Sequence, residues 1–127
     1  MKTINKRFID IALNIRKKYL TNIKMMDNYE NDIKEINDDL MKTYNNIQKI
    51  NSIDNINKKD MEEHLFKLNE KVNKLKSNID IILQKNKKLE KESDILYENI
   101  ISNYPNINNN DIQNIIQPHI NKLDEKN

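Results

Sequence analysis

The most constraining feature of this sequence is a pair of long stretches in which mostly apolar residues recur at alternating intervals of three and four. One stretch runs from Phe8 to Ile50 and the other from Met61 to Asn103, with a polar segment between them. This period keeps one stripe of an α-helix turned toward a partner helix, as a coiled coil requires. The sequence therefore predicts an all-α fold in which two long helices pack through these stripes, which we call seams.

The two seams are expected to pack against each other as a long antiparallel hairpin. The segment between them is rich in Asn, Ser and Asp, whose side chains compete with the backbone for hydrogen bonds and favour a turn. Continuing the first seam through this segment would also miss Leu65, so the repeat changes phase there. We expect helices at about 4–50 and 60–103 with a turn at 51–59, and Asp60 with Glu63 capping the second helix. One continuous helix with a local break in the repeat is the alternative.

A different element follows the hairpin, which would occupy residues 1–103. Pro105 is expected to end the second helix, because proline disfavours helical geometry in the residue before it. In the tail, 104–127, Asn108 and Asp111 have the spacing of a capping box for a short helix at about 109–117 that Pro118 would end. Such a helix is too short to be stable alone. We expect it to dock on the hairpin near Phe8 and Ile11 through four isoleucines, the alternative being a peptide that binds a partner: Ile107, Ile112, Ile115 and Ile116.

Composition excludes several classes of protein. The chain has no Gly and no Cys, which removes glycine-rich phosphate loops, disulfides, thiol nucleophiles and cysteine-ligated zinc. The 36% of hydrophobic residues predicts a thin, elongated core. No apolar run approaches the roughly 20 residues that span a bilayer. We therefore expect an intracellular protein of the cytoplasm or nucleus, with organelle targeting by the basic N-terminal segment left open.

No catalytic, cofactor-binding or metal-binding residues are predicted. The two histidines, His64 and His119, lie far apart in the sequence, which argues against a catalytic or metal-binding pair. The adjacent carboxylates Asp38 and Asp39 point to different faces of a helix, because neighbours at i and i+1 do not share a face. These patterns predict a protein that is not an enzyme, takes no cofactor and has no small-molecule substrate.

Two asparagines on the seams are unusual because they place amides in an apolar stripe. Asn22 and Asn86 would lie about one helical turn from mutual contact in an antiparallel hairpin. A buried Asn must meet another polar group and thereby selects one register of packing. The hypothesis is that the two share a polar layer that sets the register; the alternative is that each amide reaches water.

Apolar residues also extend beyond the width of the seams, more than one partner helix covers, which predicts an interface with another protein. The predicted interface residues gather toward the end of the hairpin opposite the turn: Phe8, Ile9, Ile11, Leu13, Leu20, Ile23, Met25, Ile95, Tyr97 and Ile101.

The sequence is therefore interpreted as that of a coiled-coil subunit or adaptor that packs with other helical subunits, without choosing among cytoskeletal, kinetochore, tethering and transcriptional complexes. One alternative is a homodimeric four-helix bundle. Another is an adaptor whose basic first helix, from Lys2 to Lys24, binds a membrane surface or nucleic acid.

Overall fold

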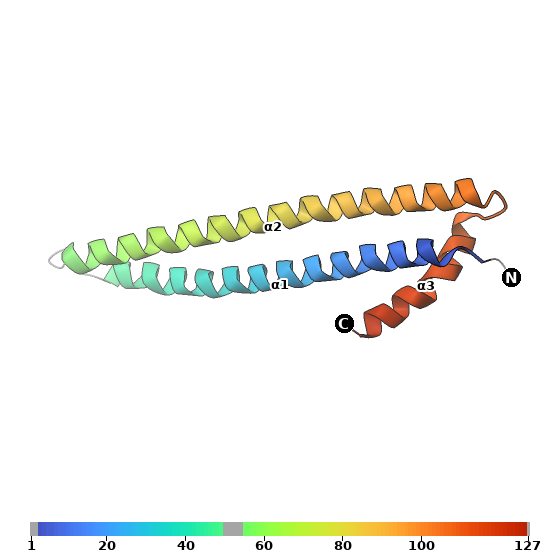
Figure 1. Cartoon of the computed structure of the whole chain (residues 1–127). Helices are drawn as coiled ribbons and strands as arrows, with labels where there is room; N and C mark the ends of the chain where they lie inside the picture. The colour runs from blue at the N-terminus through green and yellow to red at the C-terminus, as the bar shows by residue number, and fades with distance from the viewer. Residues whose placement is uncertain (1–2, 50–54, 127) are drawn as a thin grey trace. The chain divides into compact units, whose positions relative to one another are not determined.

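The structure, a computed structural model, describes residues 3–49 and 55–126, without the side chains of residues 55 and 56. The described residues form three helices: α1 (Lys6–Lys49), α2 (Asn55–Asn103) and α3 (Asn109–Glu125). Helices α1 and α2 run antiparallel and pack against each other, and α3 follows at the C-terminal end (Figure 1). The predicted all-α hairpin with an additional C-terminal helix is confirmed.

Burial in α1 and α2 follows the predicted seams. In α2, the buried hydrophobic residues are all seam residues. In α1 from Lys24 to Lys49, the side chains that are not exposed are the seven expected on the seam: Met26, Tyr29, Ile33, Ile36, Leu40, Thr43 and Ile47. If the repeat is written abcdefg with the seam at a and d, positions e and b of both helices lie on one side of an antiparallel pair, and g and c lie on the other. These letters identify the two sides below.

Local side-chain chemistry fixes the helix ends. Asn5 precedes α1, and its Oδ1 accepts a hydrogen bond from the Arg7 backbone N–H at 3.0 Å. Helix α2 ends two residues before Pro105, as predicted. The predicted capping box of α3 is also confirmed, because Asn108 Oδ1 accepts from the Asp111 N–H at 2.9 Å and Asp111 Oδ2 accepts from the Asn108 N–H at 3.1 Å.

Two predicted helix boundaries are wrong. Helix α2 begins at Asn55 instead of near residue 60, so Asp60 lies inside the helix and does not cap it. The helix propensities of Asn, Lys and Asp differ by only a few tenths of a kcal/mol per residue, so a polar segment adjoining a long helix need not interrupt it. The part of the predicted turn that falls on residues 51–54 lies outside the described residues.

The second error is the end of α3, which continues through Pro118 to Glu125 instead of stopping near residue 117. Proline lacks the N–H that would bond to the carbonyl of Asn114 four residues earlier. Asn114 and Pro118 are both exposed, so water can hydrate that carbonyl. Ile116 and Ile120 pack against the core on either side of Pro118 and hold the helix together across it.

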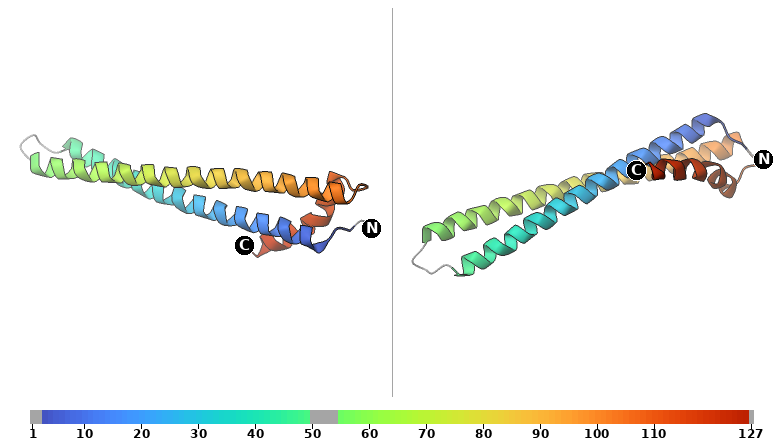
Figure 2. Two further views of the ribbon diagram at one scale, coloured as in Figure 1. Left: turned by 45° about the horizontal axis from the view of Figure 1, so that its top comes forward. Right: turned by 90° about the horizontal axis from the view of Figure 1, so that it is seen from below.

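The described residues divide into two compact units. The two-helix unit is Lys24–Ile82, and the three-helix unit comprises the described residues up to Ile23 and those from Leu83 onward. In the three-helix unit, α3 lies beside the first part of α1 (Figure 2). Its hydrophobic cluster consists of Ala12 from α1, Leu96 and Ile100 from α2, and three residues from the tail: Ile107, Ile112 and Ile116.

The docking of α3 rests on complete burial of a few large side chains. Ile112 is 0% exposed and Ile116 1% exposed, and on the α2 side Ile100 is 0% exposed. Full burial of an isoleucine contributes roughly 1.5–3 kcal/mol relative to exposure. Ile115, the remaining residue predicted to dock, is only half-buried. The Phe8 ring meets the Tyr104 ring edge to face with centroids 6.2 Å apart, next to the start of α3.

Candidate functional site

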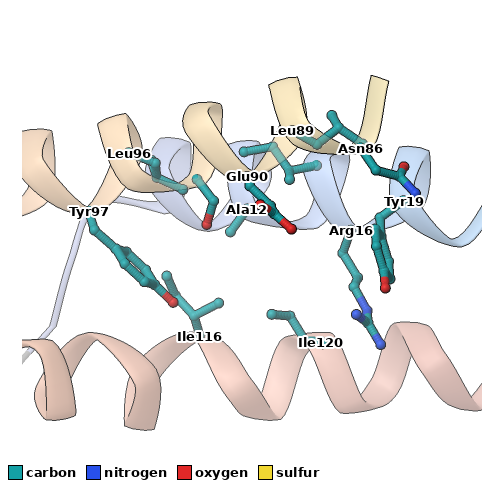
Figure 3. Close-up of a pocket in the computed structure, with 12 residues that line it drawn as sticks. Ala12, Arg16, Tyr19, Asn86, Leu89, Glu90, Leu96, Tyr97, Ile116 and Ile120 are labelled. Atoms are coloured by element: carbon teal, nitrogen blue, oxygen red, sulfur yellow. The ribbon is translucent and has the colours of Figure 1, made fainter. Parts of the chain in front are cut away.

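A cavity of about 230 Å³ lies in the three-helix unit, between α1, α2 and α3. Its apolar wall includes Ile15 from α1, Leu89 from α2, and Ile116 and Ile120 from α3. Polar groups from e positions of the long helices, among them Glu90 and Arg16, also line it (Figure 3). Because the lining combines e positions with residues of α3, the third helix packs on the e side of the α1–α2 pair.

Two small residues in the seams explain why space remains between the helices. Ala12 and Ser93 both line the cavity and occupy a positions where other turns of the seams carry Ile, Leu or Tyr. A small side chain leaves a void that close-packed neighbours fill only in part. The small side chains of Ala12 and Ser93 therefore account for the cavity, although the seam pattern alone did not predict that α3 would line it.

The C-terminal part of α3 is tied to α1 by a two-pronged ion pair. Arg16 Nε donates to Asp124 Oδ1 and Arg16 Nη2 donates to Asp124 Oδ2, each at 3.1 Å. The same guanidinium lies over the Tyr19 ring, 5.4 Å from its centroid. The arrangement satisfies the charge of Arg16 at the edge of the cavity, and both partners remain about a third exposed. Sequence reasoning missed this pair, since no periodicity links positions so far apart.

The two seam asparagines meet in the three-helix unit. Asn22 Nδ2 donates to Asn86 Oδ1 at 2.9 Å, with Asn86 buried and Asn22 half-buried. Among the side chains that the structure describes, no buried nitrogen or oxygen atom lacks a hydrogen-bond partner. The structure therefore brings together the two residues that the seam pattern singled out, and their role in setting the register stays a prediction.

The predicted interface residues fall into three groups. Phe8 and Tyr97 pack against the hydrophobic cluster of the three-helix unit, so the chain itself covers them in part. Four further residues are half-buried: Ile9, Leu13, Leu20 and Ile23. The exposed members are Ile11, Met25, Ile95 and Ile101.

Sequence reasoning missed a group of exposed apolar side chains in the two-helix unit. Met41 and Phe66 are each 63% exposed and Tyr44 is 52% exposed. Met41 and Phe66 occupy b positions and Tyr44 an e position, so all three lie on the same side of the helix pair. A signal was present, because these are the large apolar residues one position after Leu40, Thr43 and Leu65 of the seams.

Basic residues gather on the other side of the three-helix unit. Lys18, Lys85 and Lys88 line a groove with Glu92, at g and c positions, and Leu89 and Asn22 also contribute to its wall. Lys18 belongs to the basic first-helix segment that suggested binding to a membrane surface or to nucleic acid, which stays a prediction.

Features of other functional classes are not found in the described parts of the chain. Within residues 3–49 and 55–126, no three His, Asp or Glu side chains gather where they could hold a metal ion. His64 Nε2 lies 3.4 Å from Asp39 Oδ2 on the surface of the two-helix unit. Over the same residues, no helix is both long and apolar enough to cross a membrane.

Comparisons with protein-family models, with curated proteins and with solved structures found no match to this chain.

Proposed function

We propose that this protein is a non-enzymatic helical subunit that assembles with another helical protein through the e and b side of its two-helix unit. The observation that carries the proposal is the exposure of Met41, Tyr44 and Phe66 on that one side. Isolated apolar residues on a surface are ordinary, whereas several on one side of a helix pair are typical of an interface.

The three-helix unit supports this proposal by showing how such a side is covered. There, α3 packs on the e side of α1 and α2 and buries Ile112 and Ile116. In the described part of the two-helix unit, Lys24–Lys49 and Asn55–Ile82, no third helix is present. A helix from a partner that presents apolar residues at intervals of three and four would pack there as α3 does in the three-helix unit.

The test compares two triple variants of the full chain in its native cells. The first variant combines Met41→Gln, Tyr44→Gln and Phe66→Gln. It removes the exposed apolar side chains and introduces glutamine, which is a good helix former. The matched control is Asp38→Gln with Glu63→Gln and Glu70→Gln, which changes exposed f positions of the same helices. The size of the assembly in native extracts is measured by gel filtration and sedimentation, and folding of both purified variants by circular dichroism.

The expected result is that the apolar triple variant folds normally but leaves the assembly, while the control remains in it. An apolar variant that folds and still migrates in an assembly of unchanged size would refute the proposal. If the purified wild type dimerises and the apolar variant does not, a second copy of this chain is the partner, which corresponds to the four-helix bundle.

A further inference from the structure

We propose that the cavity of the three-helix unit is a binding site for a small amphipathic amine, a compact apolar body that carries one ammonium group. The cavity is lined in part by the chain's own α3 and belongs to the three-helix unit, whereas Met41, Tyr44 and Phe66 belong to the two-helix unit. It is therefore independent of the proposed assembly function, and failure of either proposal leaves the other standing.

The dimensions of the cavity set the size of the ligand. Its volume is about 230 Å³. A cavity of roughly 150 Å³ with an apolar lining is large enough for benzene, so this one accommodates a ligand of about ten non-hydrogen atoms. The walls that would contact the apolar body are Ile15, Leu89, Ile116 and Ile120.

The charged groups around the cavity determine which charge the ligand should carry. Arg16 is neutralised by its two hydrogen bonds to Asp124. The Glu90 carboxylate is directed into the space between the long helices and α3 (Figure 3). Within the described residues it is engaged in no salt bridge or hydrogen bond. The unbalanced charge on the wall is therefore a single negative one, which an ammonium group would complement.

Aromatic rings favour the same ligand. Tyr19 and Tyr97 both line the cavity and flank Glu90 in the close-up (Figure 3). The electron-rich face of a tyrosine ring attracts a cation. Arg16 already lies over the Tyr19 ring, so Tyr97 is the ring that we assign to the ammonium group. A neutral ligand would gain only the apolar contacts, and an anionic one would be repelled by Glu90.

The test uses three probes with one apolar body and different charges: 2-phenylethylamine, 2-phenylethanol and 3-phenylpropanoate. Binding to the full chain is followed by NMR shifts of the Ala12 and Ile116 methyl groups, which line the cavity. A ligand of this size in a partly open site is expected to bind with a dissociation constant on the order of 0.1–1 mM. The amine should bind most tightly and the carboxylate least.

Two variants locate the site and its charge. Glu90→Gln should weaken binding of the amine about threefold to fivefold, as expected for an exposed ion pair, and leave 2-phenylethanol unaffected. Glu98→Gln, an exposed carboxylate on the same helix that does not line the cavity, is the control and should change nothing. Ser93→Leu places a larger apolar side chain in the cavity and should weaken binding of all three probes.

The proposal is overturned if the alcohol or the carboxylate binds as tightly as the amine, or if Glu90→Gln and Glu98→Gln have equal effects. It is also overturned if the amine shifts neither methyl group at millimolar concentration in wild-type protein that circular dichroism shows to be folded.

Discussion

Replacement of the two seam asparagines by leucine is predicted to have strongly non-additive effects on stability. The amide of Asn22 donates to the amide oxygen of Asn86 at 2.9 Å, and Asn86 is only 8% exposed whereas Asn22 is half-buried. A single substitution removes this hydrogen bond and leaves the other amide unpaired. The double substitution leaves neither amide and adds two apolar side chains to the seam.

The difference in burial between the two asparagines predicts which single variant loses more stability. Asn22→Leu leaves the buried amide of Asn86 unpaired, at a cost near the upper end of the roughly 1–3 kcal/mol range. Asn86→Leu leaves the half-buried amide of Asn22, which water can reach, at a cost near the lower end of that range. Each leucine recovers up to about 1.5–3 kcal/mol by burial, less where the site is partly exposed. The double variant should therefore be more stable than wild type. Its free energy of unfolding should also exceed the value expected from the sum of the two single effects by about 1–3 kcal/mol.

The assay is urea unfolding of the four proteins, followed by circular dichroism at one protein concentration, because association would shift the apparent stability. A control cycle pairs Asn22→Leu with Ile107→Val, at the start of the α3 docking region, and should be additive. Additivity of the asparagine pair within about 0.5 kcal/mol would refute the shared polar layer. Light scattering supplies a second readout, since loss of the layer should also loosen the choice of oligomeric state; an unchanged state would contradict the register-setting role.

Three further predictions concern α3. Ile112→Ala should lower the free energy of unfolding by about 2–5 kcal/mol, because the side chain is fully buried, whereas Ile95→Ala at an exposed position should change it by less than about 0.5 kcal/mol in the same urea titration. Pro118→Ala should raise the thermal midpoint of unfolding, since it restores a backbone N–H donor inside a helix where proline costs up to about 3 kcal/mol. A lowered midpoint would contradict the reasoning that Pro118 destabilises α3. Asp124→Asn should cost less than about 1 kcal/mol in chemical unfolding, because the ion pair with Arg16 is about a third exposed, and a larger loss would show that the pair carries more of the docking than its exposure implies.

The hairpin could be predicted from the sequence because its information is periodic. The seams at intervals of three and four specify which side of each helix is buried, and burial along Met26, Ile33 and Leu40 follows that pattern turn by turn. The same register placed Asn22 and Asn86 about one helical turn from mutual contact, which suggested their pairing as one of two alternatives, and the structure shows the hydrogen bond. The cap at Asn108 was also predictable, since it depends on residues only three positions apart.

The extent of α3 and the cavity beneath it could not be predicted, because both depend on contacts between distant residues. Pro118 ends a helix in local terms, but packing of Ile116 and Ile120 on the other helices outweighs that preference. Ala12 and Ser93 are small seam residues whose consequence appears only when α3 closes over them. The ion pair between Arg16 and Asp124 likewise joins helices that no local pattern connects.

The central claim, that the e and b side of the two-helix unit is where a partner packs, is tested most directly by site-specific photo-cross-linking in the protein's own cells. A photoreactive residue at Tyr44 or at Phe66 should give one major cross-linked product, because both side chains project from the same side of the helix pair. The photoreactive residue placed instead at the exposed f positions Asp38 or Glu63 should give little cross-linked product. Equal yields at all four positions, or no product from Tyr44 and Phe66, would contradict the claim.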